Sequence, residues 1–264
     1  MMLFAGIDIG SLTAEAVVVE DSKITAAESM SVLPNPVDSA KEVMGRLLEK
    51  NGLKLENIRY TVSTGYGRER IQSEGMAQEN ISEISCHGFG AYTLEPDVRT
   101  VIDIGGQDAK VIKVNKAGKL ENFVMNDKCA AGTGQFLEVM SKTLGVGLEE
   151  LGPMSRGSRK PTEMSNRCAI YVETEVIHFL QRGVSKVDIA AGVNRAMAER
   201  VLALARRVKP EKEVMITGGV AKNVAVKDEL EKMLKVRLVK SRIDPQLIGA
   251  YGAALFAQRE GSAK

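Results

Sequence analysis

The sequence predicts an α/β protein made of two similar lobes, and two observations carry this prediction. Segments 6–19 and 101–114 read GIDIGSLTAEAVVV and VIDIGGQDAKVIKV, and six residues are identical at a constant offset of 95 positions. Both segments have the composition of buried strands around a tight Asp-x-Gly turn, and both continue into a further strand-like stretch. Helical periods follow in each half, as expected when helices cover a sheet. We interpret the pattern as an internal duplication; the alternative is two unrelated strands that share a turn.

The first half predicts a strand meander followed by alternating helices and strands. Pro34 and Pro36 interrupt the strand pattern, because proline lacks the backbone N–H that a sheet needs. The helical period that follows ends at Asn51-Gly52, residues that favour the left-handed backbone of a helix C-terminus. In chain order, we expect strands at 3–9, 14–20 and 23–30, a helix at 37–50, a strand at 58–64 and a helix at 82–94.

The second half repeats the meander and adds longer helices. The segment EVMITGGVAKN, residues 213–223, is typical of a strand, a glycine turn and the start of a helix. The other expected elements are strands within 101–114 and at 119–126, helices at 134–145, 168–182 and 186–208, and an alanine-rich helix at 247–259. We expect a first lobe at 1–95 and a second lobe at 96–246, with a C-terminal helix at about 247–260 packing back on the first lobe.

Composition excludes several classes of protein. The 264 residues carry 36 basic and 34 acidic side chains, a net charge of +2 that argues against a nucleic-acid-binding protein. No run approaches the roughly 20 apolar residues that span a bilayer, and the start, MMLFAGIDIG, lacks the basic n-region of a signal peptide. A cytoplasmic protein is therefore expected. Three cysteines without a CxxC pair predict neither a disulfide framework nor a complete metal site within one chain.

The two Asp-x-Gly turns have the chemistry of a phosphate site. Glycine lets the backbone approach a ligand, so that amide groups point at phosphate oxygens. Ser11 and Thr13 add hydroxyl donors to the first turn, and Gln107 adds an amide to the second. Asp8 and Asp103 would face each other across a cleft between the lobes, where carboxylates could hold Mg²⁺ or orient an attacking water. A single aspartate at a strand end would more simply cap its own turn.

Two Asp-x-Gly turns and the late glycine turn at 217–223 resemble the actin, Hsp70 and sugar-kinase superfamily of ATPases. The resemblance implies duplicated actin/hexokinase-like lobes of the ribonuclease H-like type around an ATP cleft. It implies catalytic roles for Asp8 and Asp103, and Gln107 could orient the water. The P-loop motif is absent. The nucleotide-binding candidates are Gly10, Ser11, Leu12, Thr13, Gly105, Gly106, Gln107, Gly132, Gly134, Gly218, Gly219 and Asn223.

Two of the cysteines occupy similar positions in the sequence. Cys129 lies in NDKCAAGTGQF and Cys168 in MSNRCAIYVETEV, and each precedes an expected helix. A helix N-terminus and a nearby cation both lower the pKa of a thiol. Three interpretations stay open: small buried core residues, a redox pair, or ligands of a shared metal centre. The cations would be Lys128 and Arg167, and the expected N-cap of the second helix is Ser165 or Asn166.

A shared centre would require a second chain. A cubane iron–sulfur cluster takes four thiolates, and one chain offers two that are suitably placed. A two-fold dimer would supply the missing pair by symmetry.

Six longer motifs resemble the activators of 2-hydroxyacyl-CoA dehydratases, which belong to the BadF/BadG/BcrA/BcrD-type family together with the ATPase subunits of benzoyl-CoA reductase. The resemblance covers about residues 4–258. It implies an ATP-hydrolysing homodimer with Mg²⁺ and one bridging 4Fe–4S cluster, held by Cys129 and Cys168 of each chain. Such a protein of anaerobic metabolism takes electrons from a ferredoxin or flavodoxin and passes a low-potential electron to a dehydratase or reductase partner. The motifs are TGYGR, SEISCHGFGA, VIDIGGQDAKV, MNDKCAAGTGQFL, VETEVI and TGGVAKN.

Several residues depart from this pattern or leave it open. Glu15 stands where many activators have lysine, and Gln135 leaves open whether the chain is a dehydratase activator or a reductase subunit. For Cys86 and His87 we favour packed positions on a helix over any ligand role. Lys110 and Lys222 are equally compatible with phosphate neighbours and with surface charges. The functional alternatives are a benzoyl-CoA reductase ATPase subunit, a carbohydrate kinase of the same superfamily, and a nucleotide-switched binding protein without a cofactor.

Overall fold

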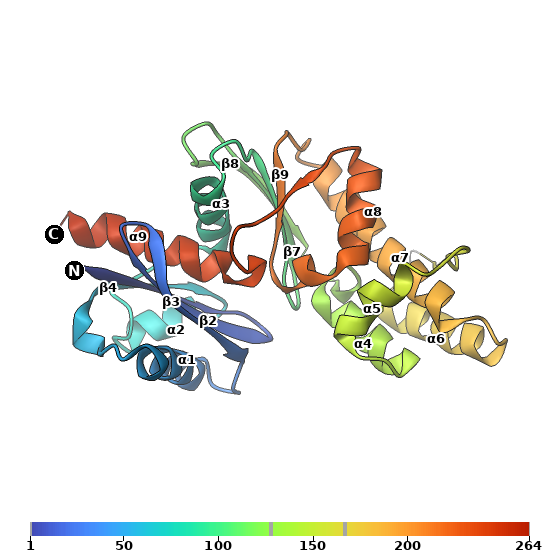
Figure 1. Ribbon diagram of the computed structural model, residues 1–264, viewed down its shortest axis with the longest axis horizontal. Helices are drawn as coiled ribbons and strands as arrows, with labels where there is room; N and C mark the ends of the chain where they lie inside the picture. Colours follow the sequence, from blue (N-terminus) through green and yellow to red (C-terminus); the bar gives the residue numbers. More distant parts are fainter. Residues whose placement is uncertain (1, 127–128, 166–167, 264) are drawn as a thin grey trace.

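Two five-stranded sheets form the centres of two lobes in the computed structural model, which describes residues 2–126, 129–165 and 168–263 (Figure 1). The strand order is β3-β2-β1-β4-β5 in the first sheet and β8-β7-β6-β9-β10 in the second. Each sheet therefore has an antiparallel meander on one side of its first strand and parallel strands on the other. The common order confirms the predicted duplication and the α/β class.

The strands of each lobe begin with the duplicated segment. Asp8 on the first strand lies opposite Glu15 on the second, and Asp103 lies opposite Lys110 in the same register of the other lobe. The first sheet contains β1 Leu3–Ile9, β2 Thr13–Glu20, β3 Lys23–Ser31, β4 Ile58–Gly65 and β5 Glu79–Asn80. The second contains β6 Thr100–Ile104, β7 Ala109–Val114, β8 Leu120–Asn126, β9 Val214–Thr217 and β10 Leu238–Val239.

The helices begin and end at recognisable signals. The Asn35 side chain accepts a hydrogen bond from the Val37 amide at the start of α1, and Gly52 ends that helix in the left-handed conformation. The helices are α1 Pro36–Asn51, α2 Arg68–Ser73, α3 Glu83–Leu94, α4 Gly134–Leu144, α5 Leu148–Ser155, α6 Ala169–Gln181, α7 Lys186–Arg206, α8 Val224–Leu234 and α9 Ile248–Ser262. Short 3₁₀ turns are η1 Leu55–Asn57, η2 Ala130–Gly132, η3 Gly219–Lys222 and η4 Pro245–Leu247.

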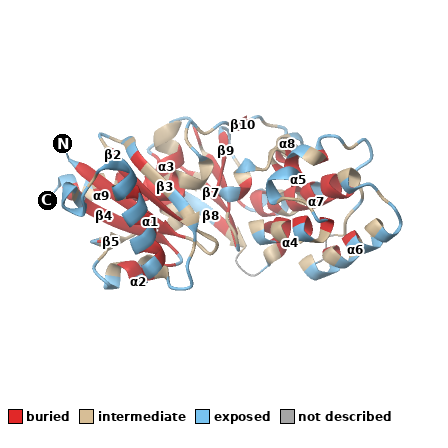
Figure 2. Ribbon diagram, turned by 60° about the horizontal axis from the view of Figure 1, so that its bottom comes forward, coloured by how far each residue is buried: buried red, intermediate tan, exposed pale blue. Residues whose placement is uncertain are grey.

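Both faces of the first sheet are covered, and β1 shows why. Leu3, Ala5 and Ile7 pack with α1, whereas Phe4 packs with α9 on the opposite face. This alternation follows from the two-residue period of a strand. In the second lobe, α4, α6 and α7 contribute to one large apolar core with β6 and β7 (Figure 2).

Helices α3 and α9 join the two lobes. The C-terminal helix α9 packs on β1, β2 and β4, and it also packs along α3 (Figure 1). Their backbones lie so close that a Cβ atom at Gly252 would be 1.9 Å from the Cys86 carbonyl oxygen. Helix α3 packs in turn on β6, β7 and β8 of the second sheet, although it precedes the predicted boundary at residue 95. That boundary stays a prediction.

No helix in the three described segments is both long and apolar enough to cross a membrane.

Candidate functional site

A cavity of about 390 Å³ lies between the lobes, and both Asp-x-Gly turns line it. The late glycine turn and the start of α4 complete its wall. Most of the predicted nucleotide-site residues are thus brought together: Asp8, Gly10, Ser11, Leu12, Thr13, Asp103, Gly105, Gly106, Gly134, Gly218, Gly219 and Asn223.

Two predicted residues lie elsewhere. Gln107 is exposed and is not among the residues that line the cavity, so the expectation of an amide beside the phosphates does not match its placement. Gly132 lines a different cavity of about 260 Å³, beside Asn126 and Arg200. The reason is local: Gly132 ends the short turn η2, and the chain reaches the cleft only two residues later, at Gly134.

The two Asp-x-Gly turns are built alike and touch each other. The Gly10 amide donates to the Thr13 carbonyl at 2.9 Å, and the equivalent Gly105 amide donates to the Asp108 carbonyl at 3.0 Å. A Cβ atom at Gly106 would lie 2.8 Å from the Ser11 hydroxyl of the other lobe. Glycine at position 106 leaves room for the Leu12 and Ser11 side chains of the first turn.

Each aspartate also faces a glycine at the end of a parallel strand. Gly65 and Gly218 both have φ of +81°, which strongly favours glycine. A Cβ atom would lie 2.4 Å from Asp8 Oδ1 in the first case and 2.8 Å from Asp103 Oδ1 in the second. The TGYGR and TGGVAKN motifs are therefore counterparts in the two lobes.

The two aspartates differ in their protonation equilibria. Burial raises the pKa of Asp8 well above its usual value, and the carboxylates of Glu15, Glu83 and Asp103 raise it further. Burial also acts to raise the pKa of Asp103, but the charges of His87 and Lys110 and a hydrogen bond from Thr217 lower it below its usual value. Opposite environments thus surround two residues of the same type.

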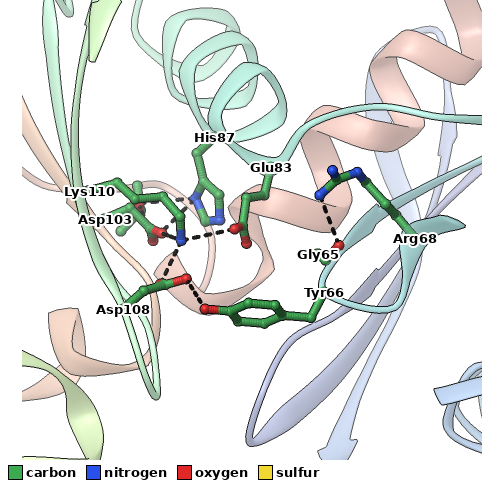
Figure 3. A network of polar contacts seen from close by, with 9 residues as sticks. Gly65, Tyr66, Arg68, Glu83, His87, Asp103, Asp108 and Lys110 are labelled. Carbon is green, nitrogen blue, oxygen red and sulfur yellow. Dashed lines mark hydrogen bonds and ion pairs between the residues drawn. The ribbon is translucent and has the colours of Figure 1, made fainter. Parts of the chain in front are cut away.

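Lys110 organises the polar network at the centre of the cleft (Figure 3). Its Nζ lies 2.6 Å from Asp108, 3.1 Å from Glu83 and 3.5 Å from Asp103. The side chain is 1% exposed, so the interpretation as a surface charge is wrong. Burial acts to lower the pKa of Lys110, and the three carboxylates more than offset this effect.

Tyr66 connects this network to the first lobe. Its hydroxyl donates to Asp108 Oδ2 at 2.8 Å, from the turn that follows β4 (Figure 3). Glu83, His87, Tyr66 and Asp108 all line the cavity, and the sequence did not single them out as site residues. These four residues lie in the motifs TGYGR, SEISCHGFGA and VIDIGGQDAKV, and this was the only sequence feature that could have identified them. The motifs do not show which of their side chains face the cleft.

The adjacent Cys86 and His87 show two outcomes of one prediction. Both are buried on α3, which confirms packed helical positions. Cys86 packs against α9, away from the cleft, whereas the His87 ring lines the cavity. His87 Nδ1 lies 3.1 Å from the Thr217 hydroxyl and 3.4 Å from Asp103 Oδ1.

The late glycine turn forms the opposite wall. Asn223 begins α8 as predicted, and its side chain accepts hydrogen bonds from the amides of Ala225 and Val226. Lys222 lines the cavity and forms a 2.7 Å ion pair with Asp244. This part of the cleft is enclosed by α5 as well, because Gly152 lies against Asn223.

The two cysteines of interest lie outside the core. Cys129 and Cys168 are exposed free thiols, so the interpretation as buried core residues is wrong for both. Cys168 itself is the N-cap of α6, in place of the expected Ser165. Cys129 precedes η2, and the Asn126 side chain both accepts from its amide and donates to its carbonyl. The predicted contributions of Lys128, Asn166 and Arg167 fall outside the described residues.

Arg200 of α7 lies between the segments that carry these cysteines. It donates to the Ser165 carbonyl at 3.2 Å and stacks over Phe136 near the start of α4. Burial lowers the pKa of the Arg200 guanidinium, and the nearby Cys129 and Glu199 act in the opposite direction.

Hydrogen bonds connect the segment after Cys129 to the second Asp-x-Gly turn. The Gly134 amide donates to the Gly105 carbonyl, and the Gln135 amide donates to the Gly106 carbonyl, each at 2.8 Å. Cys129 lies five positions before Gly134 in the sequence. A displacement of the second Asp-x-Gly turn would therefore also displace the start of α4 and the segment before it.

Comparison with known proteins gives a consistent result. The profile of the BadF/BadG/BcrA/BcrD ATPase family matches residues 5–257. The (R)-2-hydroxyglutaryl-CoA dehydratase activating ATPase of Acidaminococcus fermentans is 42% identical, with 97% of each chain covered. The activator of lactoyl-CoA dehydratase of Anaerotignum propionicum is 42% identical over the whole of both chains. A benzoyl-CoA reductase subunit of Thauera aromatica is 32% identical, with 97% of this chain and 93% of that one covered.

Solved structures agree with the fold. The activator of the 2-hydroxyisocaproyl-CoA dehydratase from Clostridium difficile, with bound ADPNP, superposes with a TM-score of 0.94 at 40% identity. That match covers 99% of this chain and 96% of the other. A ROK family glucokinase from Streptomyces griseus has a TM-score of 0.61 at 16% identity, with 97% of this chain and 99% of that one covered, which shows a shared fold alone.

Proposed function

The chain belongs to the BadF/BadG/BcrA/BcrD ATPase family, and we propose that it is an ATP-dependent electron donor that activates a 2-hydroxyacyl-CoA dehydratase. In this proposal two copies share one 4Fe–4S cluster, and ATP hydrolysis in the cleft drives a low-potential electron to the partner enzyme. The observation that carries the proposal is the pair of exposed thiols at Cys129 and Cys168, next to the structural connection between η2, α4 and the phosphate turn.

The donor set fits a cluster shared between chains. Among residues 2–126, 129–165 and 168–263, no group of three or more His, Cys, Asp or Glu side chains could hold a metal by itself. Two accessible thiols per chain are half of the four that a cubane cluster takes, and Cys129 and Cys168 are the residues that would hold it. When bound, such a cluster supplies a one-electron redox centre. Backbone amides at the start of α6 would stabilise the thiolate of Cys168.

The surface around Cys168 supports contact with a second copy. Ile170 and Tyr171 follow it on α6, and they are 74% and 56% exposed. Figure 2 shows this helix largely in the exposed and intermediate colours at one end of the molecule. A second copy related by two-fold symmetry would cover these large apolar side chains, which would account for their exposure beside a cysteine.

The cleft fits a nucleotide that arrives with Mg²⁺. Seven carboxylates and two lysines are among the described side chains that line it, so the phosphates of ATP alone would be repelled. Asp8 and Asp103 would hold the cation together with phosphate oxygens, and the bound cation would favour their ionised forms. The glycine amides of both turns would orient the phosphates, while an aspartate orients the attacking water.

The relatives support two different partner enzymes. Similarity to a benzoyl-CoA reductase subunit supports, as a second candidate, an ATPase and electron-transfer subunit of such a reductase. In both cases the proposal includes a ferredoxin or flavodoxin as the upstream donor and a cytoplasmic location.

The test is electron transfer to a 2-hydroxyacyl-CoA dehydratase. The anaerobically purified full chain, reduced chemically, is mixed with the dehydratase and either ATP or a non-hydrolysable analogue. We expect dehydratase activity with ATP and none with the analogue. Cys129→Ala and Cys168→Ala should abolish activation but retain nucleotide binding, whereas Cys86→Ala, the matched control in the core, should retain both. ADP release that depends on a sugar, without activation, would instead support a carbohydrate kinase.

A further inference from the structure

His87 is one of the side chains that connect the second Asp-x-Gly turn to the helices that join the lobes. It is 5% exposed and lies on α3, which packs both on the second sheet and along α9. Its ring lines the cleft, yet nothing in the proposed reaction so far requires an imidazole there.

The hydrogen bonds around His87 have a definite direction. The Thr217 hydroxyl donates its single proton to Asp103 Oδ1 at 2.9 Å. The contact of 3.1 Å between Thr217 Oγ1 and His87 Nδ1 therefore requires Nδ1 to carry the proton and donate to the hydroxyl. His87 thus donates to the Thr217 hydroxyl, which donates to Asp103. These two side chains together orient the Asp103 carboxylate.

The other edge of the ring faces the first aspartate. A Cβ atom at Gly249 of α9 would lie 2.1 Å from Asp8 Oδ2 and 2.8 Å from His87 Nε2. Glycine at this position leaves room for both groups at the start of α9. His87 is thus packed between the two aspartates, each of which comes from a different lobe.

Charged groups from several elements surround the ring. Asp103 on β6, Glu83 on α3 and Asp8 on β1 are carboxyl groups near it, and Lys110 on β7 is the cation already bound by Asp103 and Glu83. Helix α9 contributes Gly249, with no charge. The ring therefore orients Asp103 through the Thr217 hydroxyl at Oδ1, while Lys110 lies on the Oδ2 side of the carboxylate.

We propose that His87 is a positioning residue for nucleotide hydrolysis, which holds Asp103 through the Thr217 hydroxyl in the orientation that the reaction needs. The inference rests on the proposed ATP hydrolysis in this cleft and deepens it. Because α3 also packs along α9, the same hydrogen bonds fix the distance between the phosphate turn and the inter-lobe helices.

The test compares two substitutions that each introduce a side-chain amide, at different distances from the backbone. In His87→Asn the amide nitrogen lies near the former Nδ1 position and can donate to Thr217, whereas in His87→Gln the amide lies nearer the former Nε2 position. For His87→Gln we expect kcat for ATP hydrolysis to fall about 10- to 100-fold, the factor expected for loss of a hydrogen bond in a charged network. KM for ATP should change less than about 3-fold, and His87→Asn should retain most of kcat.

Two further variants separate this role from a general packing role. Thr217→Val removes the intervening hydroxyl and keeps the shape, so it should lower kcat as His87→Gln does. The double variant His87→Gln/Thr217→Val should be no slower than the slower single variant, because one chain of hydrogen bonds is broken in each. The matched control is His178→Asn, at the only other histidine of the chain, which is exposed on α6.

The inference would be overturned if kcat fell equally in His87→Asn and His87→Gln, or if both kept the wild-type kcat. Additive losses of kcat in the double variant, or a change in KM alone, would overturn it as well. Thermal unfolding of each full-length variant identifies any that fail to fold. If the His87 variants do not fold, kcat of Thr217→Val is compared with that of the wild type instead. If the wild-type protein binds ATP but does not hydrolyse it under any condition, the proposed function fails, which is a separate result.

Discussion

At the scale of single residues, the cleft is dominated by carboxyl groups whose burial opposes ionisation. Glu15 is the clearest case, since burial raises its pKa to about 7 although hydrogen bonds from Thr13, Gln246 and Ser29 act to lower it. By the duplication it is the counterpart of Lys110, because each lies opposite the aspartate of its own turn. The two lobes therefore place opposite charges at equivalent positions.

Glu15 should make the stability of the protein depend on pH. Its pKa rises from 4.5 when exposed to about 7 in the fold, so the folded state binds the additional proton between these values. The stabilisation is present in full below about pH 4.5 and is lost as pH rises through 7. Glu15→Gln keeps an acceptor for Gln246 and Ser29, and above pH 7 it should raise the free energy of unfolding by about 1–3 kcal/mol.

Denaturant unfolding between pH 5 and 8 measures this effect, with Glu121→Gln on the exposed face of β8 as the control. A constant difference between Glu15→Gln and wild type across the range would contradict the assignment.

At the scale of elements, the crossing of α3 and α9 sets the spacing of the lobes. Gly252 is in contact with the α3 backbone at Cys86, and Gly6 on β1 is in contact with the α9 backbone at Ala250. Glycine in a helix interior costs about 0.5–1 kcal/mol relative to alanine, so its use here reflects the close approach.

Alanine at Gly252 and at Gly45 should have opposite effects. Gly252→Ala places a Cβ atom 1.9 Å from the Cys86 carbonyl oxygen and should lower the free energy of unfolding by about 1–3 kcal/mol. Gly45, in the interior of α1, has open space around the added atom, and Gly45→Ala should raise stability by about 0.5–1 kcal/mol. Thermal or urea unfolding distinguishes the two; destabilisation by Gly45→Ala, or none by Gly252→Ala, would argue against the described packing.

The elements were largely predictable from sequence, and the inward-facing side chains were not. Strand alternation, proline breaks and capping residues such as Asn35 are local signals, and the observed bounds lie close to the predicted ones. Helix α5 had no prediction, because Gly152 and Pro153 are atypical of a helix interior. The sequence did not show that the His87 ring faces the cleft or that Gln107 lies outside its lining, because the side of a helix or turn that faces a cavity depends on the packing of the other lobe.

At the scale of the whole molecule, the lobes meet across the cleft through a few polar contacts and through the two turns. The hydrogen bond from Tyr66 to Asp108 is one such contact, and Lys110 ties Asp108 to Glu83 at the start of α3 (Figure 3). Relative movement of the lobes would have to break or lengthen these contacts. The connection from Gly105 and Gly106 to the start of α4 would carry that movement toward Cys129.

Removing the Tyr66 hydroxyl should weaken the contact between the lobes across the cleft. Tyr66→Phe loses a 2.8 Å hydrogen bond to a charged group, and because the side chain is 55% exposed we expect only about 3- to 10-fold faster nucleotide release. Stopped-flow displacement of a fluorescent ATP analogue measures the rate. The control, Tyr92→Phe, removes a hydroxyl that donates to the Lys116 carbonyl outside the cleft and should leave the rate unchanged. Equal rates in wild type and Tyr66→Phe would show that this contact does not restrain release.

A cluster shared by two chains through Cys129 and Cys168 is the feature on which the proposed function depends most. It is measured by the iron and acid-labile sulfide content of the anaerobically purified protein, together with its mass in solution. We predict a dimer with about four iron and four sulfide ions per two chains, and a monomer without iron in the Cys129→Ala/Cys168→Ala variant. A dimer without iron, or a full cluster in each separate chain, would contradict this prediction.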